Sequence, residues 1–112
     1  MTVTEKLQEM GVTLPSVAAP LASYVPAKRV GDQVWTSGQL PFVDGELPAV
    51  GKVGAEVTTE QATELARTAA LNALAAIDSQ VGLDNVTQVL KVTGFVASAP
   101  DYTQQPAVIN GA

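Results

Sequence analysis

The residues best suited to chemistry are a serine, a glycine and a glutamine at positions 37–39. They follow a β-type apolar run, residues 33–36, and Pro41 then bars further ladder pairing. Gly38 lets a ligand approach bare backbone, and Ser37 and Gln39 place hydrogen-bonding groups beside it. A strand end of this kind can hold a small polar molecule. On these residues alone, a strand exit without a ligand is the simpler interpretation, because glycine in strands often marks only a bend.

The chain contains no histidine and no cysteine. Within these residues this excludes thiolate nucleophiles, disulfides, Ser-His catalysis and metal sites built from His or Cys, so we expect no metal. Acid–base chemistry must use carboxylates, tyrosine, lysine or bound water. Carboxylate pairs at positions 5/9 and 60/64 are better explained as solvated helix faces. Tyr24, at the start of a β-type run, could point a phenol toward a pocket.

Length and composition favour one small domain. The chain has 112 residues, of which 46% are hydrophobic, but only two Phe, two Tyr and one Trp. A core of small residues must rely on close backbone packing. A chain of this size leaves much of its surface unburied, so assembly with copies of itself would help.

The charge argues against nucleic-acid and membrane partners. The net charge is −5, and the six basic residues are scattered rather than gathered into a stripe. No apolar run reaches membrane-spanning length, and no segment is typical of a signal peptide. We therefore expect a soluble cytoplasmic protein.

The elements around the candidate residues can be predicted in outline. Residues 2–10 have helical spacing, and residues 12–23 form an irregular, Pro- and Ala-rich arm. Residues 24–30 and 33–39 flank Gly31-Asp32, which predicts a hairpin with a type II′ or I′ turn. Asp44-Gly45 predicts a second turn, and residues 55–57 a further short strand.

A long helix is the clearest element, over residues 58–80. Thr58 and Gln61 fit a capping box at its start. Its alanine-rich stripe would let it lie close on a sheet. Asn72 faces inward, and a buried amide bonded to backbone is a better interpretation than a catalytic residue.

A second long strand is expected at residues 88–97, where neither face is fully polar, so both are predicted to be covered. A helix can cover one face. The other suits a subunit contact or, equally, a core in which Lys91 extends to solvent. Residues 105–112 resemble the first turns of another helix.

Three segments carry a resemblance to a known family. They are residues 34–41 (Val-Trp-Thr-Ser-Gly-Gln-Leu-Pro), 70–74 (Ala-Leu-Asn-Ala-Leu) and 89–96 (Val-Leu-Lys-Val-Thr-Gly-Phe-Val). Their order and spacing resemble the Rid family, also called the YjgF-like family of imine/enamine deaminases, from residue 15 to the end. Residues 51–54 and 108–112 are more similar to a less characterised branch than to the best-studied deaminases.

The resemblance implies an α+β, chorismate-mutase-like fold: a mixed sheet with two helices on one face. It also implies a homotrimer with pockets at the subunit interfaces. The implied reaction is hydrolysis of a reactive imine or enamine, such as 2-aminoacrylate, to a 2-keto acid and ammonia. The substrate would be a small molecule carrying a carboxylate, and no cofactor is implied.

Position by position, the resemblance implies a substrate-binding set of Tyr24, Ser37, Gly38 and Asn110. Tyr24 matches the pocket tyrosine, Ser37 and Gly38 match the pocket hydroxyl and backbone contact, and Asn110 matches an asparagine at the start of the second helix. The family's carboxylate-binding arginine and water-activating glutamate lie beyond that helix, and this sequence stops at Ala112 before either. The catalytic residues stay unknown. We expect residues 1–112 to be a single Rid-like domain lacking its C-terminal strands, as in a fragment.

Two other functions stay open. One is a non-catalytic trimeric module that binds small carboxylates, which the missing arginine and glutamate favour. The other is a ribonuclease or translation inhibitor, which the acidic charge disfavours.

Overall fold

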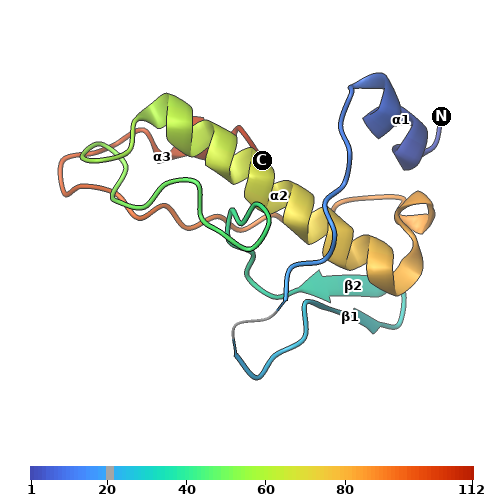
Figure 1. Ribbon diagram of the computed structural model, residues 1–112. Coiled ribbons are helices and arrows are strands. Elements are labelled where there is room, and N and C mark those ends of the chain that lie inside the picture. The colour runs from blue at the N-terminus through green and yellow to red at the C-terminus, as the bar shows by residue number, and fades with distance from the viewer. Residues whose placement is uncertain (20–21) are drawn as a thin grey trace. The chain divides into compact units, whose positions relative to one another are not determined.

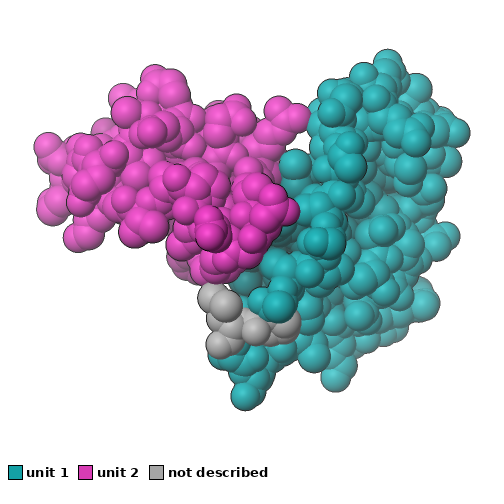
Figure 2. Space-filling model, viewed as in Figure 1, with its two compact units in different colours: residues 1–39, 71–91 teal, residues 40–70, 92–112 magenta. Residues whose placement is uncertain are grey.

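The computed structural model describes residues 1–19 and 22–112 (Figure 1). Residues 20–21, which belong to the expected irregular arm, lie outside the described residues. Two compact units share the chain, residues 1–39 with 71–91 and residues 40–70 with 92–112 (Figure 2). The long helix α2 (Thr59–Val81) contributes residues to both units. Each unit is described in turn.

The first unit begins with α1 (Val3–Glu9), close to the predicted range of 2–10. Thr2 and Glu5 form a reciprocal capping box, with each backbone N–H bonded to the other's side chain at 3.1 Å. The backbone N–H and hydroxyl of Thr4 both donate to Oδ1 of Asp84, at 2.8 and 2.7 Å. Asp84 lies in the 3-10 helix η1 (Leu83–Asn85), so these bonds fasten α1 to it.

The predicted hairpin is confirmed. Strands β1 (Ala27–Val30) and β2 (Gln33–Thr36) pair antiparallel, with Ala27 opposite Thr36. In the connecting turn Gly31 has φ +58° and Asp32 has no positive φ, which is the pattern of a type II′ turn. Both strands are shorter than predicted. Pro26 has no N–H, so it cannot extend the ladder as a donor.

Small residues pack the interior of this unit, as the composition predicts. The buried hydrophobic side chains are Ala27, Ala75, Ala76 and Leu83. Asn72 on α2 is only 2% exposed, which confirms that it faces inward. Within the described residues no buried side-chain nitrogen or oxygen lacks a hydrogen-bond partner. The amide is therefore a satisfied core group.

The second unit packs around Val53, Val57, Ala62 and Val108, with Tyr102 against this cluster. Val53 makes a parallel bridge to Ser98 through two backbone bonds of 2.9 Å with the neighbouring residues 97 and 99. Asp44 and Gly45 both have positive φ between the bridged residues 43 and 46. This is the predicted second turn, in the type I′ form.

The start of α2 confirms the predicted capping box. Thr58 N–H donates to Oε1 of Gln61 at 2.9 Å, and Gln61 N–H donates to Oγ1 of Thr58 at 3.1 Å. The helix then runs to Val81, and Gly82 follows with φ +76°. This left-handed glycine ends the helix where the sequence indicates.

Two predicted strands are not formed. Residues 54–56 form a turn, with Gly54 at φ +90°, and Val57 makes only a single bridge to Val53. Residues 88–97 are extended but belong to no ladder with any described residue. A strand needs a partner as well as the right side chains, and in the described chain only Ala97, at the end of this range, has one, through its bond from Val53. The last helix, α3 (Gln105–Ile109), is also shorter than predicted.

Candidate functional site

Ser37 and Gly38 lie directly after β2, at the end of the hairpin away from its turn. The Ser37 N–H donates to the Pro26 carbonyl at 2.9 Å, and the Ser37 hydroxyl donates to the same oxygen at 3.3 Å. Gln39 Nε2 in turn donates to the Ser37 hydroxyl at 3.5 Å. The backbone bond holds the chain in place, whereas the two side-chain bonds are long and therefore weak.

Gly38 is exposed, and its flank is open. Among the described residues, no atom outside its two chain neighbours lies within 4 Å of the position that a Cβ would occupy, and its φ lies outside the left-handed region. The local conformation therefore does not require glycine at this position. The consequence of glycine here is bare backbone that a ligand or another chain can approach.

Tyr24 precedes β1 in the same unit and is 43% exposed. The register pairs Ala27 with Thr36, and its extension places residue 24 across from residue 39. The hairpin thus brings Tyr24 to the same end as Ser37 and Gly38. These three predicted residues share one edge of one unit.

Asn110 belongs to the second unit. It is exposed and caps the C-terminal end of α3, with its N–H bonded to the Pro106 carbonyl at 3.0 Å. The prediction placed it at the start of a longer helix. In the structure the helix runs from Gln105 to Ile109, so Asn110 follows its end.

Arg29 and Arg67 take no part in the hydrogen bonds of Ser37. Arg29 Nε donates to the Gly31 carbonyl at 2.9 Å, at the turn end of the hairpin. The Arg29 guanidinium is therefore held at the opposite end of the hairpin from Ser37. Arg67 is exposed on α2 and belongs to the second unit.

Sequence reasoning missed one residue of the site, Pro26. Its carbonyl accepts both bonds from Ser37. The signal was available, because a two-residue turn at Gly31-Asp32 fixes the register that places residue 26 opposite residue 37.

Two features are absent from the described residues. Among them there is no group of three or more His, Cys, Asp or Glu side chains that could hold a metal ion. Within that same part of the chain, no helix has the length and apolar character needed to cross a membrane.

A sequence model of the family described as "YjgF/chorismate mutase-like, putative endoribonuclease" matches residues 4–112. The chain belongs to this YjgF-like family. The match includes Tyr24, Ser37, Gly38 and Asn110, and it confirms the family that the sequence motifs suggested.

Relatives of this YjgF-like chain are similar over nearly its whole length. Protein TCP17 of Trypanosoma cruzi is 39% identical over 111 residues, which cover 98% of this chain and 69% of the relative. The crystal structure of Atu1372 from Agrobacterium tumefaciens, a protein of unknown function, is 37% identical with a TM-score of 0.83. That match covers 96% of this chain and 65% of the Agrobacterium protein, so the chain spans about two thirds of its length.

A second solved structure, described as "a putative endoribonuclease" from Shewanella oneidensis, is 31% identical with a TM-score of 0.86. The match covers 99% of this chain and 74% of the Shewanella protein. These likenesses show that the chain has the YjgF/chorismate mutase-like fold.

Proposed function

We propose that this YjgF-like protein hydrolyses reactive imines or enamines of the 2-aminoacrylate type to a 2-keto acid and ammonia. The pocket would be built at subunit interfaces of a homotrimer with a mixed sheet, from Tyr24, Ser37, Gly38 and Asn110. The observation that carries the proposal is the open backbone of Gly38 beside a weakly held serine hydroxyl at the end of β2.

The hydrogen bonds of Ser37 suggest its role. Its hydroxyl donates to Pro26 and accepts from Gln39, and a hydroxyl can accept one bond more. Ser37 would thus accept a hydrogen bond from the N–H of a protonated imine or from the attacking water. Because both present bonds are long, the hydroxyl could exchange partners at small energetic cost.

Gly38 would supply backbone groups at the same place. The main chain would stay within reach of a planar substrate, because no described side chain lies within 4 Å of the Cβ position of Gly38. Backbone groups do not need to reorganise when charge develops during water attack, which favours the transition state. Tyr24, at the same end of the hairpin, would orient the substrate from the other side of the strand pair.

The proposed reaction balances without a cofactor. Water adds to the imine carbon, and the C=N π electrons move to nitrogen. The resulting carbinolamine loses ammonia as the C–N bond breaks and the C=O bond forms. One imine and one water give one keto acid and one ammonia. Attack by a positioned water requires neither His nor Cys, which suits these 112 residues.

Assembly is supported by residues 87–96. No described residue offers their backbone a hydrogen-bond partner. Four large apolar side chains on this segment are exposed: Val89, Leu90, Val92 and Phe95, at 67%, 66%, 66% and 94%. Unpaired backbone and apolar side chains are the features that sheet extension and subunit contacts bury. They favour a protein that completes its sheet by assembly.

The test uses the full-length protein, added to a reaction that generates 2-aminoacrylate. We expect faster release of ammonia and keto acid than in buffer, and light scattering at the mass of a trimer. Ser37→Ala should lower the rate about tenfold or more, since one positioned hydrogen bond is removed. Ser16→Ala is the matched control, because Ser16 is exposed in the N-terminal arm. Equal rates with protein and with buffer would reject this substrate class.

A non-catalytic module that binds small carboxylates is the second candidate. The observation that favours it is that the hydrogen bonds of Ser37 among the described residues involve Pro26 and Gln39, with no carboxylate that could activate water. Pyruvate would then raise the melting temperature without any turnover of imine. Stabilisation lost in Ser37→Ala and kept in Ser16→Ala would place that ligand at the same site.

The family description and the Shewanella relative also carry the word endoribonuclease. The net charge of −5 with six scattered basic residues argues against this activity here. Cleavage of single-stranded RNA that is lost in Ser37→Ala, with binding that weakens steeply as salt rises, would overturn our preference.

A further inference from the structure

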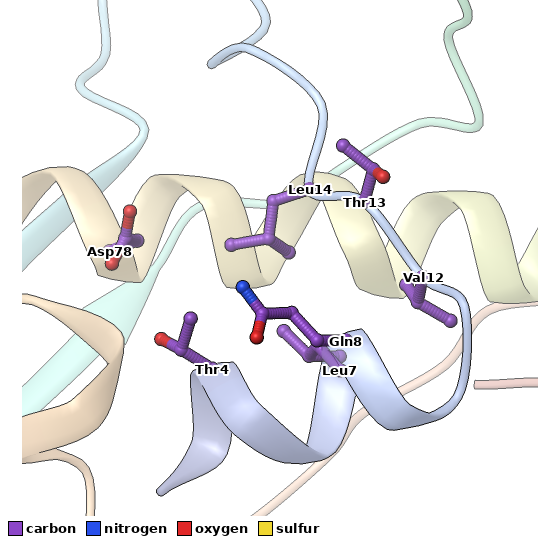
Figure 3. A pocket seen from close by; sticks show the side chains of 7 residues that line it. All are labelled: Thr4, Leu7, Gln8, Val12, Thr13, Leu14 and Asp78. Atoms are coloured by element: carbon purple, nitrogen blue, oxygen red, sulfur yellow. The ribbon is translucent and has the colours of Figure 1, made fainter.

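A cavity lies in the first unit, beside the N-terminal helix α1 (Figure 3). Its volume is about 280 Å³. Thr4, Leu7 and Gln8 line it from α1, Val12, Thr13 and Leu14 from the segment that follows, and Asp78 from α2. None of these residues belongs to the site proposed above, and the inference below does not depend on that function.

The cavity offers hydrogen-bond acceptors at Thr4 and Asp78, while the Gln8 amide and the Thr13 hydroxyl can both donate and accept. The Thr4 hydroxyl donates its proton to Asp84 at 2.7 Å, so it can offer only its oxygen to a ligand. An ionised Asp78 carboxylate can only accept, and its Oδ1 is held by the N–H of Leu83 at 2.7 Å. That bond fixes the carboxylate in place on the cavity wall.

The remaining wall is apolar. Leu7, Val12 and Leu14 are half-buried and face the cavity together. They offer a short hydrocarbon surface rather than a deep pocket. A ligand that matches both parts has hydrogen-bond donors and positive charge at one end and a short alkyl body at the other.

The charge of the cavity lining determines whether a cation or an anion is favoured as ligand. Asp78 is the one ionisable side chain among the seven lining residues, and the net charge of the protein is −5. An anion would meet a fixed carboxylate and no compensating cation. A divalent metal would find a single carboxylate, and the described residues contain no cluster of metal ligands here.

From this complementarity we propose that the cavity beside α1 binds a small primary alkylammonium ion, with its N–H donors on Asp78 and Thr4 and its alkyl chain against Leu7 and Leu14. The ammonium N–H groups can donate to these acceptors, and the positive charge is opposite to that of Asp78. The short apolar wall suits a short alkyl chain. Affinity is expected in the millimolar range, because Asp78 is exposed to solvent.

The test is a titration of the whole protein with n-butylammonium chloride, followed by amide chemical shifts in NMR. We expect shifts confined to the backbone of α1, residues 12–14 and the region of Asp78. Three probes with the same alkyl length separate the contributions: n-butanol lacks the charge, butyrate reverses it, and butyltrimethylammonium keeps the charge without N–H donors. All three should bind more weakly. No shifts with n-butylammonium, or equal shifts with n-butanol, would overturn the proposal.

Two variants and one control make the test specific. Asp78→Asn keeps an acceptor for Leu83 but removes the charge, and should weaken n-butylammonium about fivefold. Glu9→Gln removes a charge from α1 outside the cavity and should change affinity by less than about twofold, since salt screens it. Gln8→Phe narrows the cavity from an exposed position and should abolish binding. Undiminished binding in both cavity variants contradicts the proposed site.

Discussion

Gly38→Ala should raise the stability of the protein while lowering the activity that we propose. In the part of the chain that the structure describes, no atom apart from the chain neighbours lies within 4 Å of the added Cβ, and φ at Gly38 lies outside the left-handed region. Alanine therefore fits without strain and restricts the unfolded chain, which stabilises by about 0.4–1 kcal/mol. For a domain of this size the melting temperature would rise by about 2–8 °C.

The same methyl group should damage catalysis. It would occupy the open flank of Gly38 where the proposed substrate meets the backbone. A displacement of the reacting atoms by about 1 Å costs roughly a hundredfold in rate. We therefore expect a more stable protein that releases ammonia from 2-aminoacrylate about a hundred times more slowly.

Gly54→Ala is the matched control, since it should show the opposite stability change. Gly54 has φ +90°, and its Cβ would lie 2.8 Å from Cδ1 of Tyr102. Left-handed strain and overpacking together should cost about 1–3 kcal/mol. Urea unfolding of both variants, with light scattering to monitor assembly, separates an effect on folding from one on the site.

Two results would refute this reasoning. A Gly38→Ala protein with an undiminished rate would show that substrate does not approach the backbone there. A Gly38→Ala protein that loses stability as an isolated subunit would show that the flank of Gly38 is filled rather than open.

Three further predictions concern stability. Tyr102→Phe removes the 2.7 Å bond to the Thr59 hydroxyl and should lower the free energy of unfolding by about 1 kcal/mol, measured by urea denaturation. Hydrogen bonds from the Thr4 side chain and backbone hold the pKa of Asp84 below its ordinary value. The contribution of this contact to the free energy of unfolding should be complete above about pH 4 and should be lost as pH falls through the folded pKa. Asp84→Asn should remove this pH dependence of the free energy of unfolding. Thr58→Ala should cost about 1 kcal/mol through loss of the α2 cap, measured by urea unfolding followed by circular dichroism.

Each of these predictions has its own control. For Tyr102→Phe, a double-mutant cycle with Thr59→Val should leave no further loss, and full additivity would contradict the bond. For the acid-side slope, Asp101→Asn should leave the profile unchanged, because Asp101 is exposed in a turn. For the cap, Thr103→Ala should be neutral, and an equal loss at both threonines would contradict a specific role for Thr58.

The chemistry of the candidate site was partly readable from sequence. The residue types and the order Ser37-Gly38 are local information, and the two-residue turn at Gly31-Asp32 sets which residues lie across from them. Predicting the Pro26 carbonyl as the partner of Ser37 requires the strand register as well as the residue types, and it was missed for that reason. Whether the flank of Gly38 is open depends on which segments of the chain lie near it, so only the tertiary structure decides it.

Helices were predicted better than strands for a physical reason. The capping box at Thr58 and the periodic face that buries Asn72 are signals within one helix, whose hydrogen bonds are local. Residues 88–97 have strand-forming side chains, but strand bonds require a second segment, and among the described residues only Val53 bonds this backbone, at Ala97. The same dependence explains why residues 55–57 form a turn with one bridge instead of a strand.

The sequence by itself determined the family, the hairpin turn, the long capped helix and the lack of His and Cys within these 112 residues. Each of these depends on residues close together in the chain or on residue types alone. Among the described residues, the tertiary structure alone decided the unpaired backbone of residues 87–96, the open flank of Gly38 and the cavity between α1 and Asp78. These depend on contacts between distant residues, and such contacts are decided by packing rather than by local propensity.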